Sequence, residues 1–107
     1  MGTRAKIRIT NGTQSLCSKF FNMDGHVENW APILITALNQ TTPHAILKNR
    51  QLLKFMFDDY DSDDYLSYLC EVDISGDNYQ ITIYGFEKNL IFEGTLGEFS
   101  EKYDEIY

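Results

Sequence analysis

The sequence predicts a single α+β domain, in which an antiparallel sheet of about five strands packs against two to three helices. Two observations support this fold class: polar and apolar residues alternate near the N-terminus and again over residues 66–92, and apolar residues recur at helical spacing between these segments. A third is composition, because 43% apolar and 14% aromatic residues in a chain of 107 suffice for one packed core. We therefore assign residues 1–107 to one domain.

A β-hairpin is expected first. Residues 4–10 alternate with a period of two, which indicates a half-exposed strand. The outer face of this strand holds the basic residues Arg4, Lys6 and Arg8. Asn11-Gly12 is a strong hairpin turn signal, and the chain is expected to return as a second strand over residues 14–21.

Two helices are expected next. After an Asp24-Gly25 turn, apolar residues from Trp30 to Leu38 recur at helical spacing, and Pro32 fits such a helix only in its first turn. Thr42-Pro43 has the pattern of an N-cap followed by the first helical residue, so a second helix is expected to reach about Phe57.

A three-stranded meander and a final helix are expected in the C-terminal half. Residues 66–74 alternate strongly, and residues 79–84 and 90–92 follow as two further strands. The face of the first of these strands that should pack under the helices holds Leu66, Tyr68, Cys70, Val72 and Ile74. Thr95 and Glu98 have the spacing of a capping box, which predicts a helix start. The apolar stripe of this helix is Leu96, Phe99, Tyr103 and Ile106.

Charge is distributed unevenly along the chain. Residues 1–57 carry seven basic and two acidic side chains, a net charge of +5, whereas residues 58–107 carry two basic and fourteen acidic ones, a net charge of −12. Such an acidic half repels nucleic acid and attracts basic partners. No apolar run approaches the roughly 20 residues of a membrane helix, so no membrane association is expected and the protein is expected in the cytoplasm.

The candidate partner-binding site is the acidic run before the meander. It comprises Asp58, Asp59, Tyr60, Asp61, Asp63, Asp64 and Tyr65. Aspartates at positions 59, 61 and 63 have the spacing of an EF-hand loop, but the glycine and the final glutamate of that loop are missing, which argues against a calcium site. A solvated loop and an acidic recognition surface remain as interpretations.

Other chemistry has weak support in the sequence. Cys17 and Cys70 are far apart and form no metal-binding or disulfide pattern, so both are expected to be buried strand thiols. His26 and His44 lie beside helix starts, and no nucleophile or glycine-rich phosphate-binding motif accompanies them. We therefore expect no catalytic residues, no metal and no cofactor.

Short motifs at both ends of the chain resemble a known group of proteins. The start Met1-Gly2-Thr3-Arg4-Ala5, the turns at Asn11-Gly12 and Asp24-Gly25, and the segment Phe92-Glu93-Gly94-Thr95-Leu96 are similar to those of small uncharacterised proteins of phages and bacterial mobile elements. Those proteins begin Met-Gly-Thr-Arg and carry Tyr-Arg-Gln-x-Asp-Gly-Tyr-Pro. This chain departs from that motif, with Phe20-Phe21-Asn22 and His26-Val27 around its Asp-Gly turn. The resemblance implies a small phage accessory protein that binds a host machine.

The leading functional hypothesis is therefore a non-enzymatic, phage-type inhibitor in a bacterial host cell. It would bind a bacterial protein or nucleoprotein complex, such as a CRISPR effector, through the acidic run, without contacting nucleic acid directly. The alternative is a small-ligand or nucleotide-binding module that uses the N-terminal hairpin and the turn at Asp24-Gly25-His26. A small hydrolase is a third hypothesis, and it would need a pocket.

Overall fold

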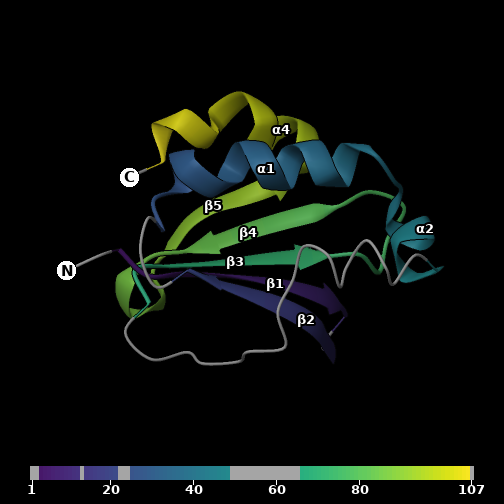
Figure 1. Cartoon of the computed structure of the whole chain (residues 1–107), viewed down its shortest axis with the longest axis horizontal. Coiled ribbons are helices and arrows are strands. Elements are labelled where there is room, and N and C mark those ends of the chain that lie inside the picture. The colour runs from purple at the N-terminus through teal and green to yellow at the C-terminus, as the bar shows by residue number, and fades with distance from the viewer. Residues whose placement is uncertain (1–2, 13, 22–24, 49–65, 107) are drawn as a thin grey trace.

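The chain folds into a five-stranded sheet with helices packed against one face (Figure 1). The computed structural model describes residues 3–12, 14–21, 25–48 and 66–106. In chain order the elements are β1 (Ala5–Asn11), β2 (Gln14–Phe21), α1 (Val27–Asn39), α2 (Pro43–Lys48), β3 (Tyr68–Asp73), β4 (Gln80–Tyr84), the 3₁₀ turn η1 (Phe86–Lys88), β5 (Leu90–Thr95), α4 (Leu96–Lys102) and the 3₁₀ turn η2 (Tyr103–Glu105).

The strand order is β2-β1-β3-β4-β5, so the predicted hairpin and meander join into one sheet. This confirms the predicted α+β class, with five strands. The sheet was expected to be antiparallel, but β1 and β3, where hairpin and meander meet, run parallel. Backbone hydrogen bonds close both ends of this pairing, from Ser67 N to Arg4 O at 2.8 Å and from Ile74 N to Thr10 O at 2.9 Å. The sheet is therefore mixed.

The position of β1 corrects the expectation of a solvated basic face. Lys6 is fully buried and Arg8 is partly buried. Because β1 lies between β2 and β3, Lys6 has Phe20 as its register neighbour on one side and Leu69 on the other. The period-two pattern does not reveal that this lysine lies in a central strand, between an aromatic and an apolar neighbour.

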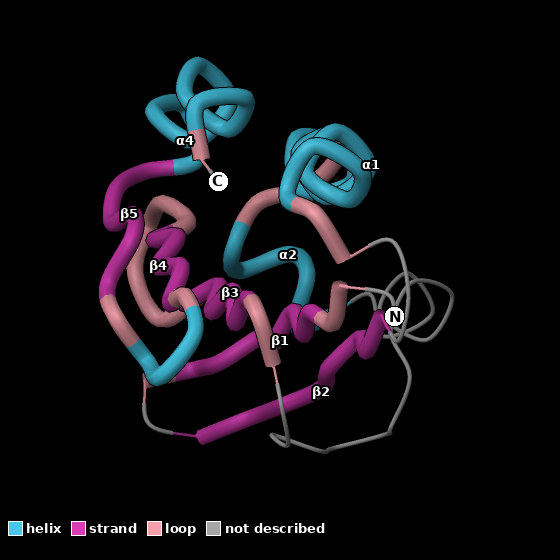
Figure 2. The backbone as a smooth tube through the Cα atoms, turned by 90° about the vertical axis from the view of Figure 1, so that its left-hand side faces the viewer, coloured by secondary structure: helices cyan, strands magenta, loops and turns pink. Residues whose placement is uncertain are grey.

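Helix α1 covers the apolar face of the sheet together with α4 (Figures 1 and 2). Its Trp30 is buried, stacks on Phe99 with 6.2 Å between ring centroids, and donates from Nε1 to the Gly25 carbonyl at 2.9 Å. Pro32 was expected in the first turn, but it lies further inside the helix. Its ring is exposed, so it avoids the core, and its carbonyl accepts a hydrogen bond from Thr36 Oγ1 at 2.8 Å.

The helix caps form as predicted. Thr42 Oγ1 accepts from Ala45 N at 3.1 Å at the start of α2, and residues 49–57, over which this helix was expected to continue, lie outside the described part of the chain. At α4 the capping box is complete: Thr95 N donates to Glu98 Oε1 at 3.1 Å, and Glu98 N donates to Thr95 Oγ1 at 3.2 Å. The predicted stripe of this helix is also confirmed, because Phe99 is buried and Leu96, Tyr103 and Ile106 pack against the core.

Candidate functional site

The acidic run that the sequence predicts as the binding site lies outside the described residues. This applies to every member of the predicted site: Asp58, Asp59, Tyr60, Asp61, Asp63, Asp64 and Tyr65. The next residue after the run, Leu66, is described and lines a pocket on the face of the sheet opposite α1 and α4.

The turn between β4 and β5 has an unusual backbone. Glu87 and Lys88 both adopt left-handed conformations with φ of 62°, a region that residues other than glycine enter rarely. Hydrogen bonds hold this shape: Gly85 N donates to Asn89 O at 2.7 Å, and Lys88 N donates to Gly85 O at 3.1 Å. Asn89 Nδ2 also donates to the carbonyl of Phe86 at 3.1 Å. Hydrogen bonds within the turn therefore hold its backbone in this shape.

This turn presents apolar side chains to solvent. Five large apolar side chains are exposed among the described residues, and three of them belong here: Phe86 at 63%, Leu90 at 57% and Ile91 at 38%. We call these three residues the hairpin patch. The other two, Leu16 and Ile33, lie on β2 and α1. Since exposed apolar groups that cluster often mark interaction sites, whereas isolated ones are ordinary, the hairpin patch is a candidate binding surface.

Close packing within the turn explains why residue 85 is a glycine. A Cβ atom on Gly85 would lie 2.5 Å from Cδ1 of Ile91, which is too close for any real side chain. Ile91 therefore packs over the backbone of Gly85. Phe86, the next residue, remains exposed.

A pocket of about 500 Å³ opens beside the hairpin patch. Its apolar and aromatic wall is formed by Leu66, Leu69, Tyr84 and Phe86. Its charged residues are Arg8, Glu71, Glu87 and Lys88, so positive and negative groups are balanced. This volume falls in the range of small-molecule sites, and it could equally receive a side chain of a protein partner.

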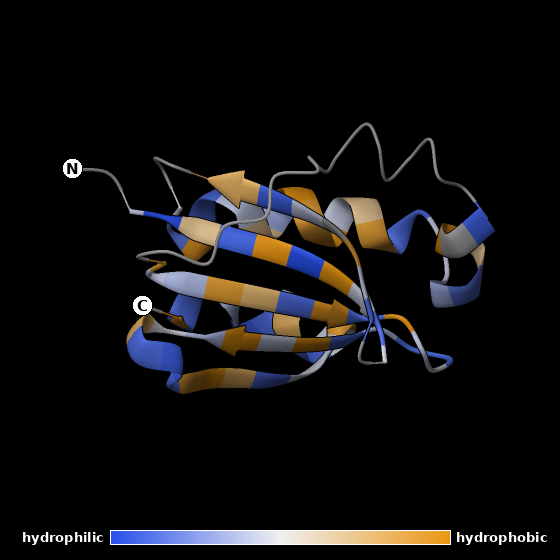
Figure 3. Cartoon of the chain, turned by 90° about the horizontal axis from the view of Figure 1, so that it is seen from below, coloured by the Kyte–Doolittle hydropathy of each residue, from blue (hydrophilic) through white to orange (hydrophobic). Residues whose placement is uncertain are grey.

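Acidic side chains continue from β5 into the last helix. We call Glu93, Glu101, Asp104 and Glu105, all of which are exposed, the acidic ridge. The same stretch has one basic residue, Lys102, and the carboxylate of Glu98 is held in the capping box. Figure 2 shows α4, β5 and η1 one above another along the same side of the molecule, so the ridge and the hairpin patch share this side. In Figure 3 the strand at the lower edge of the sheet changes from hydrophobic to hydrophilic along its length.

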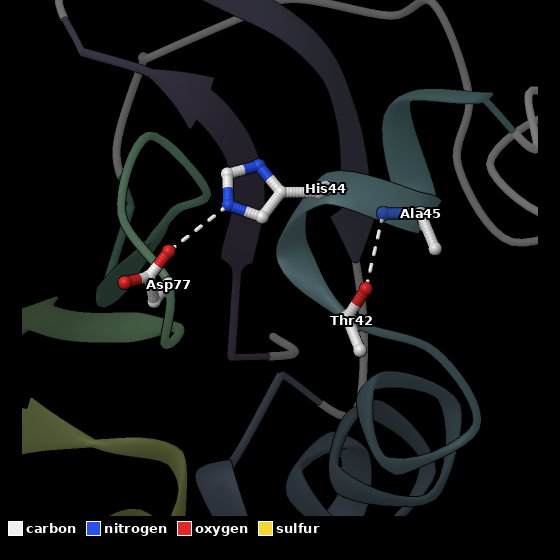
Figure 4. A network of polar contacts seen from close by, with 4 residues as sticks. All are labelled: Thr42, His44, Ala45 and Asp77. Carbon is white, nitrogen blue, oxygen red and sulfur yellow. Dashed lines mark hydrogen bonds and ion pairs between the residues drawn. The ribbon is translucent and has the colours of Figure 1, made fainter.

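The two histidines are confirmed as surface residues near helix starts. His26 Nε2 lies 3.0 Å from Thr3 Oγ1, and His44 Nε2 lies 3.1 Å from Asp77 Oδ1 (Figure 4). His26 contacts a hydroxyl group and His44 contacts a carboxylate. Neither histidine, among the described residues, contacts both groups as a catalytic triad requires. The His44 contact instead ties α2 to the turn between β3 and β4.

The predicted burial of Cys70 is confirmed, and Cys17 lies in β2. Burial, with a smaller effect of the neighbouring Glu71, raises the pKa of the Cys70 thiol well above its usual range. A thiol held in its neutral form is a poor nucleophile. Within the described ranges, no group of three or more histidine, cysteine or acidic residues is placed to hold a metal ion.

The alternative site around Asp24-Gly25-His26 has a structural role where it is described. Gly25 N donates to Thr3 O at 2.9 Å, and a Cβ atom on Gly25 would lie 2.6 Å from that same oxygen. Together with the bond from Trp30 to the Gly25 carbonyl, this close approach fastens the start of α1 to the chain segment before β1. Asp24 lies outside the described residues.

Comparison with protein-family models, curated proteins and solved structures finds no match to this chain. No helix in the described part of the chain is long and apolar enough to cross a membrane. Function must therefore be inferred from the surface of the chain itself.

Proposed function

We propose that the protein is a phage-type accessory protein that binds and inhibits a bacterial protein and catalyses no reaction. The observation that carries this proposal is the hairpin patch on the same side of the molecule as the acidic ridge. An apolar centre with a charged rim is the usual anatomy of a protein interface. The partner class that we favour is a nucleic-acid-handling defence complex such as a CRISPR effector.

Electrostatics is the reason for this partner class. Proteins that bind nucleic acid present basic surfaces to phosphates, and an acidic protein competes for those surfaces. Four exposed carboxylates on the ridge and a net charge of −7 for the whole chain favour this kind of encounter and disfavour direct contact with nucleic acid. The charges would chiefly raise the association rate, while the apolar patch would hold the complex together.

Phe86 is the best candidate for the anchor of the interface. Aromatic side chains that enter a partner pocket commonly contribute about 2 kcal/mol or more to binding. At 63% exposure Phe86 is little used by the fold, and Leu90 is similar at 57%. The acidic run adds five aspartates shortly before Leu66 in the sequence, and Leu66 lines the pocket beside Phe86.

A comparative pull-down tests the proposal. The tagged protein is incubated with bacterial lysate at low and at high salt, and the bound proteins are identified by mass spectrometry. A double variant, Phe86→Ser with Leu90→Ser, should lose the partner, whereas Ile33→Ser should keep it. Ile33 is a matched control because it is 61% exposed but lies on α1, away from the hairpin patch.

A charge variant separates the electrostatic contribution. Glu101→Gln, Asp104→Asn and Glu105→Gln together should weaken binding and flatten its salt dependence, as should replacement of the five aspartates at 58–64 by asparagine. Retention of the same partner by the patch variant and by both charge variants would contradict the proposal.

A small ligand is the second candidate function, and the 500 Å³ pocket favours it. The pocket receives Arg8 from the N-terminal hairpin, which the sequence had linked to ligand binding. A ligand at about 100 times its Kd would stabilise the fold by about 2.7 kcal/mol. A thermal-shift screen of metabolites, repeated with Tyr84→Ala, would detect such a ligand and locate it.

A further inference from the structure

We propose that an extended segment of the partner, bearing lysine or arginine, adds to β5 as a sixth strand of the sheet. This inference rests on the proposed function, because it states how the same side of the molecule holds its partner. Addition of a strand to a sheet edge is a recurring mode of peptide recognition, in which main-chain hydrogen bonds supply affinity and alternate side chains supply specificity.

The position of β5 makes this possible. It is the last strand in the order β2-β1-β3-β4-β5, and among the described strands it pairs with β4 alone. Every second backbone N–H and C=O of an edge strand points away from the sheet and can bond to another strand. Figure 2 shows β5 on the outer side of the sheet, with no described strand beyond it.

The edge of β5 is only partly protected. Proteins commonly shield edges with proline, lysine or a bulge. Residues 90–95 contain neither proline nor lysine. The pairing with β4 shifts register between Ile83 and Tyr84, close to the turn, and the pairs from Phe92 to Thr95 are regular. A regular stretch of β5 is therefore available as a template.

Side chains on β5 define what kind of strand would fit. Glu93 is exposed, its register neighbour on β4 is the uncharged Thr82, and it forms no ion pair with another described residue. Cross-strand pairs of opposite charge stabilise a sheet, so a basic residue beside Glu93 would be favoured. Leu90, which is 57% exposed, pairs with Tyr84, and Tyr84 lies on the same face of β4 as Thr82. Leu90 therefore shares the face of Glu93 and favours an apolar residue next to it. The fitting strand carries a basic and an apolar residue on the same face.

The opposite edge would reject the same segment. β1 and β2 contain the basic residues Lys6, Arg8 and Lys19 and no acidic residue. Like charges on neighbouring strands are destabilising. A basic segment should therefore choose β5 and not β2, which is a prediction that a residue-resolved experiment can check.

Amide hydrogen exchange measured by NMR on the whole chain tests the proposal. The probe is a short peptide that repeats Lys-Thr-Val-Thr, which places lysine and valine two positions apart on the same face, and the control is the same peptide with glutamate in place of lysine. At low salt the lysine peptide should slow exchange about tenfold at alternate residues of β5, because only the outward amides gain a partner, and should leave β2 unchanged. Glu93→Lys should reverse the preference, so that the glutamate peptide protects β5, whereas Glu101→Lys on α4 should leave the preference for the lysine peptide intact.

Three results would overturn strand addition. The first is no alternate protection of β5 by either peptide, even if the pull-down identifies a partner; in that case the proposed function stands and only the mode of binding fails. The second is perturbation confined to α4 and η2. The third is protection of β5 that grows with protein concentration in the absence of peptide, which would identify a second copy of the chain as the occupant of the edge.

Discussion

Replacing Phe99 and Phe86 in turn tests whether the first stabilises the fold and the second serves the binding surface. Phe99 has no exposed surface and its ring lies 5.6 Å from Phe92, 6.2 Å from Trp30 and 6.3 Å from Tyr103, measured between centroids. Replacement of such a residue by alanine removes the buried ring and leaves a cavity, at a cost of about 3–5 kcal/mol. A domain of this size has a total stability of about 5–15 kcal/mol, so Phe99→Ala should lose a large part of it.

Urea unfolding followed by the fluorescence of the single tryptophan, Trp30, measures this loss, because that residue lies in the same cluster. Phe86→Ala is the matched control: with 63% of its side chain exposed, it should change the unfolding free energy by no more than about 0.5 kcal/mol. Equal losses for the two variants, or a loss below about 1 kcal/mol for Phe99→Ala, would refute the assignment of Phe99 to the core and of Phe86 to the binding surface.

Four further predictions concern single positions. Lys88→Gly should stabilise the protein by about 1 kcal/mol in urea unfolding, because glycine adopts the left-handed φ of 62° without steric strain. Thr95→Ala should cost about 1 kcal/mol in the same assay, since it breaks the capping box of α4. Cys70 should react with a thiol reagent only as fast as the protein unfolds, because the thiol is fully buried and its pKa is raised. Burial raises the pKa of Tyr79 to about 12, above the ordinary value of 10.0. The contribution of Tyr79 to stability should therefore be present below pH 10 and fall as the pH rises towards 12. The difference in unfolding free energy between wild type and Tyr79→Phe, measured over that range, should show this fall.

Local patterns were sufficient to predict most of the elements. The hairpin signal at Asn11-Gly12, the cap at Thr42 and the capping box at Thr95 each depend on residues within a few positions of one another, and all three structures form. The hairpin turn starts one residue later than the signal, because Asn11 pairs with Gln14 at the end of β1 and Gly12 takes the positive φ of 68°. Alternation also assigned the buried face within β3, with Cys70 and Val72 in the core. Leu66 was expected on the same face, but it lies before the first residue of β3 and lines the pocket on the opposite face of the sheet. Such features can be predicted from the sequence because the residues that determine them are neighbours in the chain.

Features that depend on distant partners were not predicted. The parallel pairing of β1 with β3 joins segments that carry no mutual signal, and the buried Lys6 lies on one of these two strands. Pro32 was restricted to a first turn by a local rule, whereas the structure places it inside α1 with its ring exposed. One feature of the sequence indicated the hairpin patch: the apolar residue Phe86 lies at a turn, where polar residues are usual.

The parallel pair at the centre of the sheet also bears on the order of events during folding. The β1–β2 hairpin depends on local contacts and can form within microseconds, but the place beside β1 stays empty until the segment from Tyr68 to Asp73 arrives. Contacts between segments so far apart in sequence are the slow step of folding in small domains. Until they form, the apolar side of α1 has little of its sheet to cover, so the nascent chain has to carry Trp30 and Leu34 exposed while the second half is synthesised.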